Sequence, residues 1–158
     1  MKSASVAELK KELKSLSHPQ LLEICMRLAK YKKDNKELLT YLVFEAENEQ
    51  TYLSAIKAEM DDLFEEINYS NAYLAKKGLR KILRNLNKYI RYSGIVETEI
   101  EALIYFCKKI KNSRINTFMK SNQVLANLYE QQLKKINKAI GKLHEDLQYD
   151  YTKEMQGL

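Results

Sequence analysis

The sequence contains little glycine or proline, with four glycines and a single proline in 158 residues. Sheet proteins of this length need such residues every few positions, because turns demand a positive or a fixed φ angle. Their scarcity argues against a β protein and favours helices with short polar connections. The chain also lacks any apolar run near the roughly 20 residues that a bilayer-spanning helix requires, so we expect no membrane span.

Residues suited to catalysis near neutral pH are equally scarce, since the chain holds two histidines and two cysteines. His18 precedes Pro19 at an expected helix start, and the two acids after His144 point about 100° apart around a helix, so neither histidine predicts a metal site. Cys25 and Cys107 occupy apolar helical positions without a second ligand nearby, which predicts small core residues. The chain has neither a Glu-x-x-His pair nor a glycine-rich phosphate loop. We therefore predict no enzyme activity, no metal and no cofactor.

The length and composition are those of one globular domain. Hydrophobic residues make up 45% and charged residues 30% of the chain, and this length buries enough apolar surface to fold without disulfides or metals. We predict a single domain over residues 1–158. The first sixteen residues are polar and periodic and lack the apolar segment of a secretory signal, so we expect a cytoplasmic protein.

Apolar residues recur at intervals of three and four along the chain, the spacing of amphipathic helices. This pattern predicts an all-α protein of about seven helices, packed as an antiparallel array or bundle, with a HEAT-like α-solenoid as the alternative. Gly94 is placed to end one of the longer helices in a left-handed conformation. Three pairs spaced three residues apart predict helix caps: Ser5 with Glu8, Ser17 with Gln20, and Asp34 with Glu37.

The last apolar stripe of the chain has the 4, 3, 4, 3, 4 spacing of a coiled-coil seam. Its residues are Tyr129, Leu133, Ile136, Ile140, Leu143 and Leu147. A continuous helix over residues 121–155 would measure roughly 50 Å at 1.5 Å per residue, more than the roughly 40 Å across a compact domain of this size. We expect this helix to extend from the core, to bend at Gly141, or to pair with a second copy in a homodimer.

Positive charge is concentrated in the middle of the chain. Residues 67–129 hold twelve Lys and Arg against three acids, residues 1–66 hold ten against thirteen, and residues 130–158 hold five of each, giving +9, −3 and 0. On the helix expected around residues 76–91, six cations lie opposite the apolar stripe: Lys77, Arg80, Lys81, Arg84, Lys88 and Arg91. Such a surface attracts phosphates, anionic lipid or acidic protein.

These features favour a non-enzymatic interaction or scaffold domain that associates with itself through the last helix or docks an acidic protein partner on residues 76–91. The alternative is a nucleic-acid-binding protein that uses the same cationic face, with tyrosines such as Tyr73 and Tyr89 stacking on unpaired bases. A third reading involves no ligand. The acids of residues 45–66 would then neutralise the cations within the fold.

Three segments resemble the start of a known family. They are residues 9–17 (LKKELKSLS), the helix expected at residues 21–30, and residues 36–42 (KELLTYL). Together they resemble, over the first third of the chain, a family of small bacterial proteins of unknown function. The resemblance implies a small all-helical bacterial protein and carries no activity.

Overall fold

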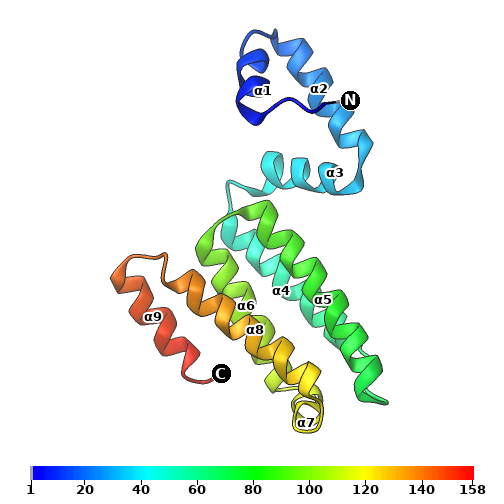
Figure 1. The fold of residues 1–158 in the computed structure, drawn as a ribbon, viewed down its shortest axis with the longest axis vertical. Helices are drawn as coiled ribbons and strands as arrows, with labels where there is room; N and C mark the ends of the chain where they lie inside the picture. The colour runs from blue at the N-terminus through cyan, green and yellow to red at the C-terminus, as the bar shows by residue number, and fades with distance from the viewer. Residues whose placement is uncertain (1) are drawn as a thin grey trace. The chain divides into compact units, whose positions relative to one another are not determined.

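The computed structural model describes residues 2–158, which are helical and contain no β-strand (Figure 1). The predicted all-α class is confirmed, but these residues form nine α-helices and one π-helical turn rather than about seven helices. In chain order the elements are α1 (Val6–Leu13), α2 (His18–Tyr31), α3 (Lys33–Thr40), the turn η1 (Tyr41–Glu45), α4 (Glu49–Glu65), α5 (Ala72–Ser93), α6 (Val96–Lys111), α7 (Ile115–Met119), α8 (Gln123–Ile140) and α9 (Glu145–Met155). None of the helices described is long and apolar enough to cross a bilayer.

Contacts divide the chain into two compact units, Met1–Phe44 and Glu45–Leu158, termed here the first and second unit. Apart from Tyr41, every buried hydrophobic residue of the described chain lies in the second unit. The core therefore lies in the second unit, and the expectation of a single domain over residues 1–158 stays a prediction. The apolar stripes of α1, α2 and α3 form helices but no core of their own, because so short a segment can bury only a small share of its surface.

The first unit confirms two of the three predicted helix caps. The backbone N–H of Ser5 donates to the Glu8 carboxylate at 2.7 Å, and these hydrogen bonds from Ser5 lower the pKa of Glu8. At the second start, the backbone N–H of Ser17 donates to Oε1 of Gln20 at 2.9 Å. The third cap is wrong, because α3 begins one residue before Asp34. Asp34 lies instead in the first turn, where a negative charge favours the helix dipole.

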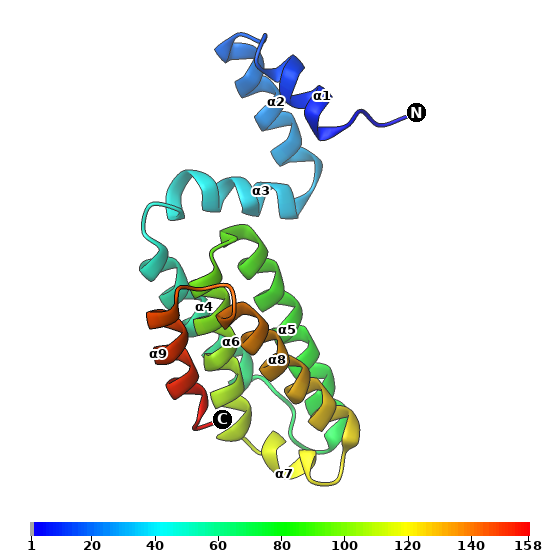
Figure 2. The same cartoon turned by 60° about the vertical axis from the view of Figure 1, so that its left-hand side comes forward.

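The second unit is organised around α6, which packs against α4, α5 and α8 (Figures 1 and 2). Eight residues of α6 are buried: Thr98, Ile100, Ala102, Leu103, Ile104, Phe106, Cys107 and Ile110. A helix that is apolar on several sides is suited to the centre of a bundle rather than to its surface. Figure 2 shows α9 on the flank of this group, where it packs against α8.

Three residues explain the length and position of α5. The side chain of Asn71 caps the start of α5, because its Oδ1 accepts a hydrogen bond from the backbone N–H of Leu74 at 2.9 Å. Gly94 ends it with φ at +67°, which confirms the predicted left-handed cap. Gly78 lies inside the helix and allows the Ile67 side chain to pack closely against it, because a Cβ at this position would lie 3.0 Å from Cγ1 of Ile67. A substitution at Gly78 would therefore displace Ile67.

The expected continuous helix over residues 121–155 is wrong. The chain leaves the helical conformation after Ile140, and α8 and α9 are separate helices with residues 141–144 between them. The break begins at Gly141, the residue expected to bend the helix, because glycine is a poor helix former.

The predicted self-association seam on these helices also has to be corrected. Tyr129, Ile136 and Ile140 are buried within the second unit, Leu133 and Leu143 are half-buried, and Leu147 alone is exposed. Packing of α8 against α6 uses most of this stripe, so too little remains for a partner helix.

Candidate binding groove on α5

The cationic side of α5 lies opposite its buried stripe. The residues of that stripe are Ala75, Leu79, Ile82, Leu86 and Ile90, and they face the core of the second unit. Of the six predicted cations, five are exposed to solvent and Lys88 is half-buried. The ammonium of Lys88 lies 5.3 Å from the centre of the Tyr89 ring.

Two acids of α4, Glu49 and Glu59, accept hydrogen bonds from uncharged groups of neighbouring helices. Glu59 accepts hydrogen bonds from the Tyr89 hydroxyl at 2.8 Å and from Nδ2 of Asn85 at 3.4 Å. Glu49 accepts from the Thr98 hydroxyl at 2.6 Å. Uncharged groups of α5 and α6 therefore occupy these two carboxylates.

Asp61 is engaged by α6. The ammonium of Lys109 lies 2.7 Å from Oδ1 of Asp61 and lowers the pKa of that carboxyl. The Tyr105 hydroxyl donates to the same carboxylate at 2.7 Å. Burial, reinforced by this hydrogen bond, raises the pKa of Tyr105 to about 12. This cluster joins α4 to α6 and contributes nothing to the neutralisation of α5.

An ion pair connects the acidic segment to one of the predicted cations, between Lys81 and Glu66 at 3.3 Å. Both side chains are more than half exposed, and such a pair contributes at most about 1 kcal/mol. Lys77, Arg80, Arg84 and Arg91 make no ion pair within the part of the chain that the structure describes. Ion pairs with the described acidic residues therefore do not neutralise these four cations.

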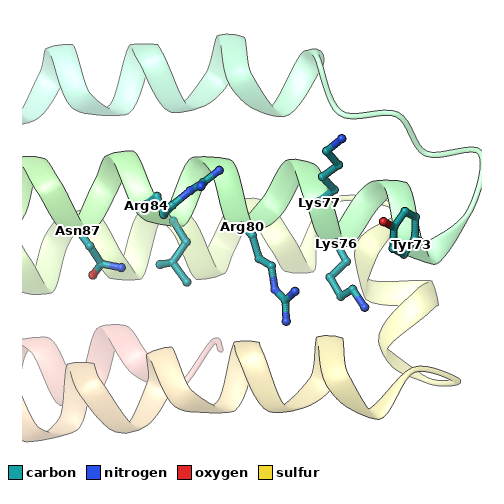
Figure 3. Close-up of a pocket in the computed structure, with 7 residues that line it drawn as sticks. Tyr73, Lys76, Lys77, Arg80, Arg84 and Asn87 are labelled. Carbon is teal, nitrogen blue, oxygen red and sulfur yellow. The ribbon is translucent and has the colours of Figure 1, made fainter.

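The cationic side chains of α5 do not all extend in the same direction. In Figure 3, the side chains of Lys76 and Arg80 extend on the side of α8, whereas Lys77 extends on the side of α4. Tyr73, Lys76, Arg80, Arg84, Asn87 and Arg91 follow one another along α5 at intervals of three and four residues. We term these six residues the groove row.

Two adjoining grooves follow this row. The first, of about 480 Å³, is lined by Tyr73, Lys76, Lys77, Arg80, Leu83, Arg84 and Asn87 (Figure 3). The second, of about 730 Å³, is lined by Arg84, Asn87, Ile90, Arg91, Gly94, Ile95, Glu99 and Lys135. They share Arg84 and Asn87, so together they accompany nearly the whole of α5, roughly 30 Å at 1.5 Å per residue.

The single acid of the groove is already paired. Glu99 lies 3.3 Å from the ammonium of Lys135 on α8. Lys135 also donates to Oδ1 of Asn87 at 2.8 Å and so joins α8 to the groove row. Leu83, Ile90 and Ile95 supply an apolar lining between the charged side chains. The groove therefore offers an apolar strip beside a row of arginines.

Sequence reasoning identified the arginines of this groove but not all of its residues. Lys76 and Asn87 lie in the same part of the chain, and a helical wheel centred on Arg80 and Arg84 could have found them. Lys135 comes from α8, and its approach depends on how two helices pack, which no local pattern of residues encodes.

The other candidate chemical groups lie apart from one another. No three His, Cys, Asp or Glu side chains gather as a metal-binding set among residues 2–158. Cys107 is buried in α6, and burial raises the pKa of its thiol to about 12. Cys25 is exposed on α2, contrary to the prediction that both cysteines lie in the core.

A comparison with protein-family models, curated proteins and solved structures finds no match to this chain. The resemblance of its first third to a family of small bacterial proteins therefore stays a prediction.

Proposed function

We propose that the protein is a non-enzymatic interaction module that docks an acidic segment of a partner protein in the groove along α5. The observation that carries this proposal is the state of Arg80, Arg84 and Arg91. They are exposed beside the groove and form no ion pair with the described residues. Guanidinium groups bind carboxylates through two parallel hydrogen bonds in a planar, bidentate geometry, so a row of arginines favours Asp and Glu side chains as ligands.

The apolar lining supports a protein segment over a bare polyanion. Leu83 and Ile95 would remain in contact with water beneath a phosphate chain, whereas an amphipathic acidic helix could cover them. Helix-in-groove recognition works in this way, with apolar anchors at intervals of three and four residues. The acids flanking those anchors would then meet the arginines of the groove row.

A model peptide tests this proposal. The probe is a labelled amphipathic helix with leucine on one face and glutamate on the other, and its binding to the full chain is followed by fluorescence anisotropy. Reversing three charges, in Arg80→Glu/Arg84→Glu/Arg91→Glu, should weaken binding by roughly ten-fold or more, since each exposed charge contact is worth a few tenths of a kcal/mol to 1 kcal/mol.

The matched control reverses three exposed lysines of the same unit, in Lys134→Glu/Lys138→Glu/Lys142→Glu. Both variants change the net charge by −6, so a difference between them reports the groove and not the overall charge. Equal weakening by the two variants, or no binding of the probe to the unaltered protein at low salt, would contradict the proposal.

A second candidate is single-stranded nucleic acid, which one observation favours. Tyr73 stands at the end of the groove, 68% exposed, with the Lys76 ammonium 5.6 Å from its ring centre. An exposed aromatic ring beside a cation can stack on an unpaired base. Binding of a labelled RNA oligonucleotide should then weaken steeply as salt rises and should weaken further in Tyr73→Ala. Absence of RNA binding at low salt would remove this candidate.

A further inference from the structure

The first unit exposes far more apolar surface than its helices need. Eleven large hydrophobic side chains between residues 6 and 44 are 36–82% exposed: Val6, Leu9, Leu13, Leu22, Ile24, Met26, Leu28, Tyr31, Leu42, Val43 and Phe44. At about 100 Å² each they present roughly 1,000 Å² of apolar surface in total, spread over several helices. A standard interface removes about 800 Å² from each partner, so the first unit has enough surface for one.

Part of this surface is organised as a groove on α2. The groove has a volume of about 530 Å³ and is lined by Ile24, Leu28 and Tyr31, with Arg27 and Lys30 along one edge. The three apolar residues are spaced i, i+4, i+7, which places them in one row on the helix. Leu28 is 55% and Tyr31 76% exposed. This face of α2 therefore matches half of a helix–helix contact.

The charges along the edge of the row indicate what completes that contact. Glu23, Arg27 and Lys30 lie on the same side of α2 and are exposed. Glu23 and Lys30 take part in no ion pair within residues 2–158. When two identical helices pack antiparallel about a two-fold axis, the same edge of each helix faces the other. If the axis lies midway between two residues that are seven positions apart, each of them lies opposite the other in the partner helix. Glu23 of each copy then faces Lys30 of the other.

We propose that a second copy of this chain docks on the α2 groove, with the two α2 helices antiparallel about an axis between Met26 and Arg27. Ile24 of each copy then packs near Leu28 of the other, and two symmetric Glu23–Lys30 pairs flank the apolar contact. A two-fold interface of this kind is the commonest form of self-association in proteins.

Two features oppose the contact, and neither outweighs it. Arg27 of each copy comes near the axis, where Glu23 of the same helix lies one turn away and offsets its charge. The first unit carries nine Lys and Arg against five Asp and Glu, a net charge of +4. Repulsion between such units is screened beyond roughly 8 Å at physiological ionic strength, whereas the apolar contact is short-ranged and unscreened.

The test measures dimerisation of the full chain by analytical ultracentrifugation. Leu28→Ser should weaken the dimer by roughly 100-fold, because it removes an anchor from both sides of the contact. Glu23→Lys and Lys30→Glu should each weaken it by roughly ten-fold, since each replaces two attractive pairs by two repulsive ones. The double variant Glu23→Lys/Lys30→Glu should recover the original dimer, and a mixture of the two single variants should form heterodimers.

Exchanging the charges of residues 23 and 30 distinguishes a second copy of this chain from any other partner of the α2 groove. The double variant has the net charge of the unaltered chain, so a dimer that fails to recover in it would overturn the proposal. A strict monomer at every concentration would also overturn it. Lys142→Glu, an exposed change in the second unit, should leave the dimer unaltered. The groove-row variant Arg80→Glu/Arg84→Glu/Arg91→Glu should dimerise normally, so failure of one proposal leaves the other intact. Far-ultraviolet circular dichroism of each variant checks that it remains helical.

Discussion

The two units contain the same kind of helix and differ in what the helices enclose. In both units apolar residues recur every three to four positions, and helices begin at caps such as Ser5 and Asn71. The second unit buries its stripes around α6, whereas α1, α2 and α3 contain no buried residue. An apolar stripe is therefore enough to predict a helix. Burial of the stripe requires in addition a neighbour that is apolar on several sides.

The largest expected effect uses the two cysteines, one in each unit. Cys25 on α2 is exposed, while Cys107 on α6 is buried with its thiol pKa raised to about 12. At neutral pH and in dilute solution, a thiol reagent that produces a coloured product should modify Cys25 roughly a thousand-fold or more faster than Cys107, which reacts only when the second unit opens. Denaturant should make the two rates similar. Equally fast modification of the two cysteines in the native protein would show that α6 is no better protected from the reagent than α2.

Truncation of one side chain in each unit compares their cores directly. Phe106 is fully buried in α6, with its ring 5.9 Å from that of Phe64, whereas Leu22 on α2 is 55% exposed. Phe106→Ala should lower the free energy of unfolding by about 3–5 kcal/mol through lost burial and a cavity. Leu22→Ala should lower it by less than about 1 kcal/mol. Urea denaturation followed by circular dichroism measures both, and a comparable loss from Leu22→Ala would indicate a core in the first unit.

A smaller effect concerns the Asp61 cluster of the second unit. Lys109 lowers the pKa of Asp61 below its usual value of 3.8, so the charged carboxylate stabilises the folded state at neutral pH. That contribution is lost as the pH falls below 3.8 and the carboxylate takes up a proton. With the Asp61 side chain 41% exposed, solvent screening limits the cost of Asp61→Asn to about 0.5–1 kcal/mol at pH 7.

The pH dependence of stability distinguishes this cluster from a general charge effect. Urea denaturation of Asp61→Asn and of the unaltered chain should give converging free energies of unfolding as the solution is made more acidic. Asp62→Asn is the control, because Asp62 is exposed and makes no ion pair within the described residues. A difference that stays constant down to strongly acidic pH would show that the Lys109 pair is not its source.

The smallest expected effect concerns the ion pair between Lys81 and Glu66. Both side chains are exposed, so Lys81→Ala should change the free energy of unfolding by no more than about 0.5 kcal/mol. High salt should abolish even this difference. A loss of several kcal/mol in the same urea experiment would mean that the acids of the second unit do hold α5 in place.

Local patterns predicted the parts of this structure that local chemistry decides. The caps at Ser5 and Ser17, the left-handed end of α5 at Gly94 and the all-helical class follow from residues close together in the sequence. The break after α8 was foreseen at Gly141 as a bend, but not as the end of a helix. Whether a stripe is buried was not predictable in this way, because burial depends on partners that are distant in the chain.

The candidate groove shows the same limit. A helical wheel placed Arg80 and Arg84 opposite the buried stripe, and the structure leaves both in solvent. The wheel could not say which cations extend toward α4 and which toward α8, because that depends on how α5 packs between these helices. Lys135 enters the groove only through that packing, where it donates to Asn87.

The central position of α6 limits how the protein can be divided in the laboratory. Helices that enclose it come both before it, in α4 and α5, and after it, in α8. A fragment that begins after Glu65 or ends before Gln123 would lose one of these walls and expose Ile104 and Phe106 to water and to other chains. The shortest fragment of the second unit worth expressing therefore extends from Glu49 to Ile140. Limited proteolysis should likewise favour sites outside that range.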